Sequence, residues 1–200
     1  MGNRCPPSRG QAGINVPEAR ALHLGEGPHA PFLARRFDRA PDGGRIPFVS
    51  AMTLTPRTAG ESDASYLELV DLLQSRGADT AHDCKELVRR VLFSILIHNT
   101  DDCLRNQGFL ISERGLSLSP AYAINPTIAR NNPSLAINEI ETACDVAIAM
   151  DSCKAYGIST RHADVLLQRV RAAVSEWQAV ASRLEIPKSA QNLMSRACPI

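Results

Sequence analysis

The chain has 200 residues, of which 44% are hydrophobic and 22% are charged, and its formal net charge is +1 at pH 7. A chain of this length fits one domain, or one domain with a small appendage. A charge so close to zero argues against direct binding of nucleic acid or of an anionic membrane, because either needs a strong positive field. No apolar run reaches about 18 residues, so we expect no transmembrane helix. Met1–Gly10 also lacks the apolar core of a secretory signal, and we therefore expect a cytoplasmic protein.

The first part of the chain is predicted to contain a tail, short strands and loops. Residues 1–12 are polar and rich in glycine, proline and arginine, and we expect them to be disordered. Extended segments, a turn and a strand are predicted to follow over residues 14–19, 21–24, 25–30 and 32–37. Such a β unit could cross a nucleotide cleft, with its backbone groups facing adenine and Asp38 within reach of a ribose hydroxyl. A hairpin with a charged, exposed face fits the same residues equally well.

Two amphipathic helices are predicted in the middle of the chain. The first covers about residues 64–74, where apolar side chains recur at helical spacing. The second follows from Asp83, a suitable N-cap, and carries two adjacent apolar rows formed by Leu87, Val88, Val91, Leu92, Ile95 and Leu96. This broad stripe predicts a buried helix beneath the polar stretch that comes next. Neither a Walker loop nor a kinase glycine-rich loop occurs in the sequence.

The polar stretch Asn99–Leu110 carries the candidate chemistry. Within it, Asp101 precedes Asn106 by five residues, on a loop between the predicted helix and a short strand. In phosphoryl transfer, an aspartate in this position can orient the attacking hydroxyl and accept its proton, and the asparagine oxygen can bind Mg²⁺. The spacing alone is a weak signal, because Asp and Asn are also common in hydrogen-bonded turns. Both interpretations remain open from the spacing alone.

The remainder of the chain is predicted to form a hairpin and a helical scaffold. The segments GFLIS and LSLSP are expected to be short strands joined at residues 113–115. The helices expected after them are one over residues 139–156 that stops at Gly157, a long one capped by Ser159 or Thr160 and ended by Pro187, and a short one over 189–197. The six cysteines are scattered without metal-ligand spacing, which favours reduced thiols. The whole pattern predicts an α+β fold that is mainly helical.

Two segments resemble a known family. NTDDCLRNQGFL at 99–110, followed by LSLSPAYAINPT at 116–127, is similar to the catalytic and metal-binding segments of HipA-type serine/threonine kinases, the toxins of bacterial toxin–antitoxin pairs. Further matches are GINVPEA at 13–19, FLARRFDR at 32–39 and GGRIPFVSAMTL at 43–54. The resemblance covers residues 13–200 but only the later half of a typical member. It implies a protein-kinase-like C-terminal lobe with short hinge and interlobe strands, truncated and with its N-lobe largely missing.

The resemblance also implies site residues and ligands. Asp101 corresponds to the catalytic base and Asn106 to a metal ligand. The implied cofactors are ATP and Mg²⁺, and the implied acceptor is a protein serine or threonine. The implied partner is a small DNA-binding antitoxin. The residues implied to contact the nucleotide are Arg35, Arg36, Phe37, Asp38, Cys103, Leu104, Arg105, Asn106, Tyr122 and Ala123.

The sequence departs from the family pattern in ways that weaken its expected chemistry. Ala123 stands where the family has an aspartate that bridges Mg²⁺ to the phosphates, and a methyl group cannot coordinate a cation. Asp102 is the nearby carboxylate that could replace it. Cys103 and Gln107 stand where the pattern usually has histidine, and the first lysine in the chain is Lys85. A phosphate-binding lysine is therefore not found before that position.

These departures predict a truncated kinase-family protein with weak or no phosphotransfer activity. The alternative is a non-catalytic binding module, acting as a decoy or as half of a split kinase, that docks an antitoxin or a missing N-lobe subunit. A third interpretation is a decaying gene fragment with no selected role. A cut through a kinase cleft would expose apolar surface, so we also expect self-association.

Overall fold

The computed structural model describes residues 11–22, 31–58, 63–128 and 133–198. The strands are β1 (Ala19–Ala21), β2 (Phe32–Ala34), β3 (Phe48–Ser50), β4 (Gly108–Ser112) and β5 (Gly115–Leu118). The helices are α2 (Ala51–Leu54), α3 (Leu67–Arg76), α4 (Thr80–Leu96), α5 (Val146–Ser152), α6 (Thr160–Ser175), α7 (Trp177–Arg183) and α8 (Lys188–Met194). The expected α+β class, with more helix than strand, is confirmed. Within the described ranges, no helix is both long and apolar enough to cross a bilayer.

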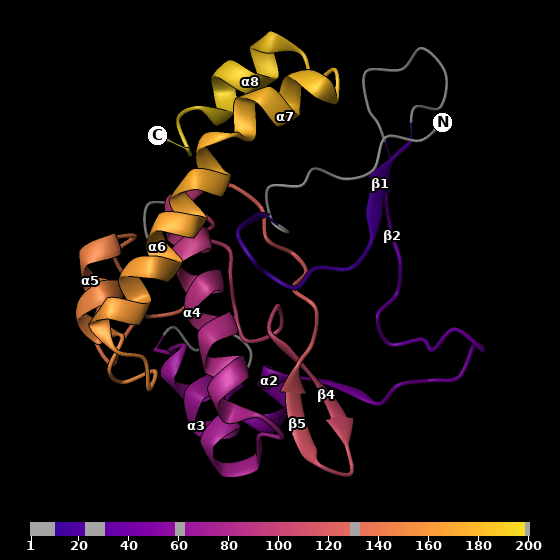
Figure 1. Ribbon diagram of the computed structural model, residues 1–200, viewed down its shortest axis with the longest axis vertical. Helices are drawn as coiled ribbons and strands as arrows, with labels where there is room; N and C mark the ends of the chain where they lie inside the picture. The colour runs from indigo at the N-terminus through magenta and orange to yellow at the C-terminus, as the bar shows by residue number, and fades with distance from the viewer. Residues whose placement is uncertain (1–10, 23–30, 59–62, 129–132, 199–200) are drawn as a thin grey trace.

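Helix α4 is the central element of the fold. It packs against α3, α5, α6 and β5 (Figure 1). Its buried face includes Leu87, Val91 and Leu92. The helix begins earlier than expected, because Asp79 is the N-cap and its carboxylate accepts a hydrogen bond from the His82 amide at 3.1 Å. The prediction that Asp83 caps the helix is wrong. Asp83 lies inside the first turn, where its buried carboxylate accepts from the Leu118 amide at 3.0 Å.

Two small antiparallel sheets flank this helical body. Strands β3, β4 and β5 form one sheet in that order, and β1 pairs with β2 in a separate hairpin (Figure 1). The hairpin of β4 and β5 is confirmed, with Phe109 opposite Leu118 and Ser112 opposite Gly115. Gly115 has φ +122°, a backbone conformation that glycine adopts without strain. The strand expected over residues 32–37 ends at Ala34.

The C-terminal helices differ from the prediction in two places. The helix expected over residues 139–156 covers only α5, because Asn138 and Asp145 bind backbone amides and hold the preceding segment in turns. The long helix divides at Glu176 into α6 and α7. Of the two caps considered, Ser159 is the N-cap and accepts from the His162 amide.

The N-terminal predictions are only partly covered by the described residues. Residues 1–10 of the expected tail and the turn expected at 25–30 lie outside them. Gln11 and Ala12 are described, and Ala12 is completely buried. The Arg169 guanidinium on α6 donates to the Gln11 carbonyl at 3.1 Å, which ties this end of the chain to the helical body.

Candidate functional site

The loop of residues 99–107 follows α4 and places Asp101 next to Asn106. The Asn106 side-chain amide donates to the Asp101 carbonyl at 3.1 Å, and Asp101 is exposed. The loop is held from both sides, because the Asn99 amide donates to the Ser94 carbonyl and the Ser134 amide donates to the Thr100 carbonyl. The structure thus brings together the two residues that the spacing singled out. Their assignment as base and metal ligand stays a prediction.

Asp102 points inward rather than into the site. Only 2% of the residue is exposed. Its carboxylate accepts from the Tyr66 hydroxyl at 2.7 Å and from the Gln107 side-chain amide at 3.0 and 2.9 Å. Burial raises the pKa of this carboxyl, while the hydrogen bonds from Tyr66 and Gln107 act in the opposite direction. A carboxylate so enclosed is unavailable to replace the missing metal ligand at position 123.

The backbone of the loop also accepts hydrogen bonds from α2. The Ala51 amide donates to the Gln107 carbonyl at 2.8 Å, and the Met52 amide donates to the Leu104 carbonyl at 3.2 Å. The Leu104 residue is 1% exposed, so its side chain packs in the core. Cys103 is half-buried and Arg105 is exposed.

An aromatic cluster connects the segment after β2 with the segment after β5. The Phe37 ring stacks on Tyr122 at 5.8 Å between centroids, and Phe48 on β3 meets both rings edge-on at 5.3 and 6.2 Å. The Tyr122 hydroxyl donates to the Arg105 carbonyl at 2.8 Å, and burial raises its pKa to about 12. Gly108 leaves room for Phe48, since a Cβ there would lie 2.3 Å from the Phe48 ring. Phe37 and Tyr122 were among the candidate site residues, but sequence reasoning did not include Phe48 or Gly108, because no local pattern marks them.

The charged residues on either side of Phe37 form ion pairs among themselves. The Asp38 carboxylate accepts from the Arg36 guanidinium with both oxygens, and from Arg39 at 2.9 Å. The hydrogen bond from Arg36 lowers the pKa of Asp38 to about 2. The Arg35 amide donates to the Glu18 carbonyl at 2.8 Å. A nucleotide contact by Asp38 would have to share a carboxylate that already binds two arginines.

Ala123 lies immediately beyond the aromatic cluster with an unusual backbone. It is exposed and has φ +53°, a left-handed conformation that aspartate and asparagine adopt more readily than alanine. Its methyl group offers no ligand, and Asp102 is enclosed. No group of three or more His, Cys, Asp or Glu side chains that could hold a metal is found among the described residues. The donor set that the structure describes therefore does not fit a complete Mg²⁺ site.

Comparison with known proteins places this geometry in a family context. The family model described as HipA-like C-terminal domain matches residues 9–177. No curated protein matches the chain. A solved structure that is similar is the toxin–antitoxin system HipA of Shewanella oneidensis MR-1, in complex with HipB and its operator DNA, at 16% identity and a TM-score of 0.75. The match covers 96% of this chain and 52% of that chain, so the present chain spans about half the length of the HipA structure.

Proposed function

The chain belongs to the family of HipA-like C-terminal domains, and on that premise we propose that it is a serine/threonine-kinase-like protein of a toxin–antitoxin system with weak or no phosphotransfer activity. The proposal includes binding of ATP beside the 99–107 loop and the aromatic cluster, with little contribution from Mg²⁺. The similarity in fold to a HipA chain supports this assignment.

The retained part of the site supports nucleotide binding. Asp101 is exposed beside Asn106, and Tyr122 joins the loop to Phe37 through one hydrogen bond and one ring contact. The proposal requires the ligand to lie within reach of the exposed Asp101 carboxylate and of the half-buried Phe37 and Tyr122 rings. If a serine or threonine hydroxyl were brought to Asp101, this carboxylate could accept its proton, which is the role that the resemblance implies.

Ala123 is the single observation that carries the proposed loss of activity. Charge that develops on a transferring phosphoryl group needs stabilisation, and one such contribution is worth several kcal/mol. A methyl group supplies none of it. Asp102 does not compensate, since both of its oxygens accept hydrogen bonds within the buried cluster.

Transfer of labelled γ-phosphate to a serine- and threonine-containing substrate mixture tests the activity. We expect the wild-type rate to lie at least about a hundredfold below the roughly 1–100 s⁻¹ of ordinary kinases. Ala123→Asp is expected to raise transfer, and Asp101→Asn in that background to remove the gain. A wild-type rate in the ordinary range would overturn the proposal of weak activity.

Exposed apolar side chains favour a second candidate function, a docking module. Phe32 and Leu33 on β2 are 59% and 48% exposed, and Ile111 on β4 is 43% exposed. A partner subunit or an antitoxin that covers these side chains would gain hydrophobic stabilisation, and without one we expect self-association.

Sedimentation velocity over a range of concentrations tests this second candidate. The wild type is expected to associate as its concentration rises, and Phe32→Ser/Leu33→Ser to remain monomeric. Ile140→Ser is the matched control, because Ile140 is 83% exposed and lies in the segment before α5. A wild-type chain that stays monomeric throughout would count against self-association through β2.

A further inference from the structure

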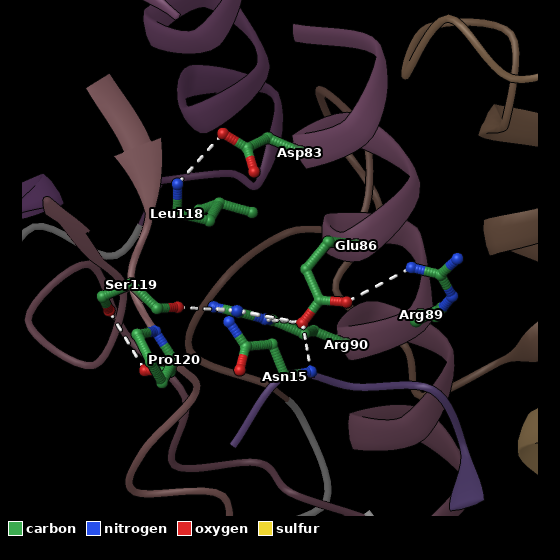
Figure 2. A network of polar contacts seen from close by, with 8 residues as sticks. All are labelled: Asn15, Asp83, Glu86, Arg89, Arg90, Leu118, Ser119 and Pro120. Atoms are coloured by element: carbon green, nitrogen blue, oxygen red, sulfur yellow. Dashed lines mark hydrogen bonds and ion pairs between the residues drawn. The ribbon is translucent and has the colours of Figure 1, made fainter. Parts of the chain in front are cut away.

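A buried ion pair lies on α4, between the N-terminal segment at Asn15 and the segment after β5 at Ser119. The Arg90 guanidinium donates to the Glu86 carboxylate at 3.0 Å, and the two side chains are 2% and 5% exposed (Figure 2). Burial lowers the pKa of Arg90, and the Glu86 charge acts against that shift. Burying two charges is costly unless further hydrogen bonds satisfy them, so their other partners indicate what the pair does.

Those other partners are the backbones of two separate segments. The Asn15 amide donates to Glu86 at 2.9 Å, and Arg90 donates to the Ser119 carbonyl at 2.7 Å (Figure 2). The two segments also bind each other, because the Ala121 amide donates to the Asn15 carbonyl at 2.8 Å. The ion pair therefore lies where the N-terminal segment and the segment after β5 run together.

Both segments continue into the candidate site. The chain beyond Asn15 forms the hairpin of β1 and β2 and then reaches Phe37. The chain beyond Ser119 reaches Tyr122 and Ala123. The segments meet a second time where Phe37 stacks on Tyr122, and Tyr122 binds the carbonyl of Arg105 in the 99–107 loop. The two segments therefore contact each other at two places, one beside the ion pair, before the β1–β2 hairpin, and one at the rings, after it.

We propose that Glu86 and Arg90 are a positioning pair for the candidate site, holding the β1–β2 hairpin and the Tyr122–Ala123 segment in one fixed relation to the 99–107 loop. The nucleotide-binding role of that site rests on the proposed function, whereas the positioning itself does not. Neither side chain would touch a nucleotide; both act through the two backbones that they hold.

The chain offers a matched control on the same helix. Arg89 binds the other oxygen of Glu86 at 3.3 Å, and its side chain is 19% exposed. Arg89→Met removes a guanidinium from Glu86 but leaves the hydrogen bonds to Asn15 and Ser119. Glu86→Met/Arg90→Met removes both buried charges together, which avoids leaving one of them unpaired and favours a folded variant.

The experiment compares the wild type, Glu86→Met/Arg90→Met and Arg89→Met in the full chain. Hydrogen exchange of the Ala121 amide is the first readout, because its acceptor, the Asn15 carbonyl, is altered by neither substitution. The second is the ¹⁹F resonance of Tyr122 in 3-fluorotyrosine-labelled protein, which contains three tyrosines and is assigned with Tyr122→Phe. Exchange of α6 and the Tyr156 resonance report on the rest of the fold.

We expect the double variant to exchange the Ala121 amide about tenfold faster or more and to shift the Tyr122 resonance, with α6 and Tyr156 unchanged. Arg89→Met should behave as the wild type. Unchanged Ala121 and Tyr122 signals, or equal changes at α6 and Tyr156, would overturn the positioning role. If the double variant does not fold, Arg90→Lys, which keeps the charge but loses the two-sided guanidinium contact, is measured in the same way and is expected to show the same local changes. ATP affinity is measured in parallel: absence of binding in the wild type would refute the proposed function while the exchange and ¹⁹F results still decide the positioning.

Discussion

Tyr66→Phe removes one hydroxyl from a buried site and leaves the rest of the ring in place. That hydroxyl donates to the Asp102 carboxylate at 2.7 Å, and both residues are at most 3% exposed. A hydrogen bond to a charged group contributes about 1.5–3 kcal/mol to the free energy of unfolding. For a domain of this size, the loss corresponds to a decrease in Tm of roughly 3–12 °C. Tyr156→Phe is the control, since the Tyr156 hydroxyl donates to the neutral Ile137 carbonyl and its loss should cost only about 0.5–1.5 kcal/mol.

The two variants should also differ in their pH dependence. Burial raises the pKa of Asp102 in the folded protein, and the Tyr66 hydrogen bond lowers it, so Tyr66→Phe raises it further. A carboxyl whose folded pKa exceeds its unfolded pKa contributes stability below the unfolded value and loses that contribution as the pH rises through the folded value. The destabilisation caused by Tyr66→Phe should therefore be larger near neutral pH than in acid.

Urea unfolding followed by circular dichroism, at several values between about pH 4 and pH 8, measures this difference. We expect the change in unfolding free energy for Tyr66→Phe to grow with pH, and that for Tyr156→Phe to stay constant. Equal and pH-independent changes in the two variants would refute the description of Asp102, buried within the 99–107 loop, as an acceptor whose charged form the Tyr66 hydrogen bond stabilises.

Three further substitutions test individual features. Ala123→Gly should raise the unfolding free energy by about 0.5–1 kcal/mol in urea titration, because glycine relieves the left-handed backbone; a decrease would contradict the strain. Leu104→Ala should lower the unfolding free energy in urea titration by about 2–5 kcal/mol, because Leu104 is a core residue. An unchanged unfolding free energy would contradict its burial in the core. Gly108→Ala should cost about 1–3 kcal/mol by displacing Phe48, visible as a lower urea midpoint, whereas an unchanged midpoint would show that the ring moves freely.

The features predicted correctly from the sequence depend on local patterns. The hairpin of β4 and β5 follows from two short apolar runs separated by a glycine turn, and α4 follows from its helical apolar periodicity. Asp101 and Asn106 also lie together because a single short loop contains both, and their roles stay a prediction. Each of these predictions needs only residues that are near one another in the chain.

The errors and omissions involve partners that are distant in the sequence. Aspartate is a common N-cap residue, but the carboxylate of Asp83 accepts a hydrogen bond from the amide of Leu118, which is 35 residues away. Asp102 binds Tyr66 across 36 residues, and Glu86 binds Asn15 across 71. No periodicity or spacing encodes such pairs. The burial of Asp102 and the contacts of the Glu86–Arg90 pair with Asn15 and Ser119 are therefore visible only in the folded structure.

Thermal unfolding of the full chain with ATP, in EDTA and in excess Mg²⁺, tests the central claim most directly. A ligand that binds only the folded state at about 100 times its Kd adds roughly 2.7 kcal/mol, or about 5–11 °C for a domain of this size. We predict such a shift with ATP in EDTA, and the same shift within error when Mg²⁺ is present. Ala123→Asp should make the shift larger with Mg²⁺ than without it. An unchanged Tm under both conditions would refute ATP binding. A wild-type Tm shift that requires Mg²⁺ would contradict the impaired metal site.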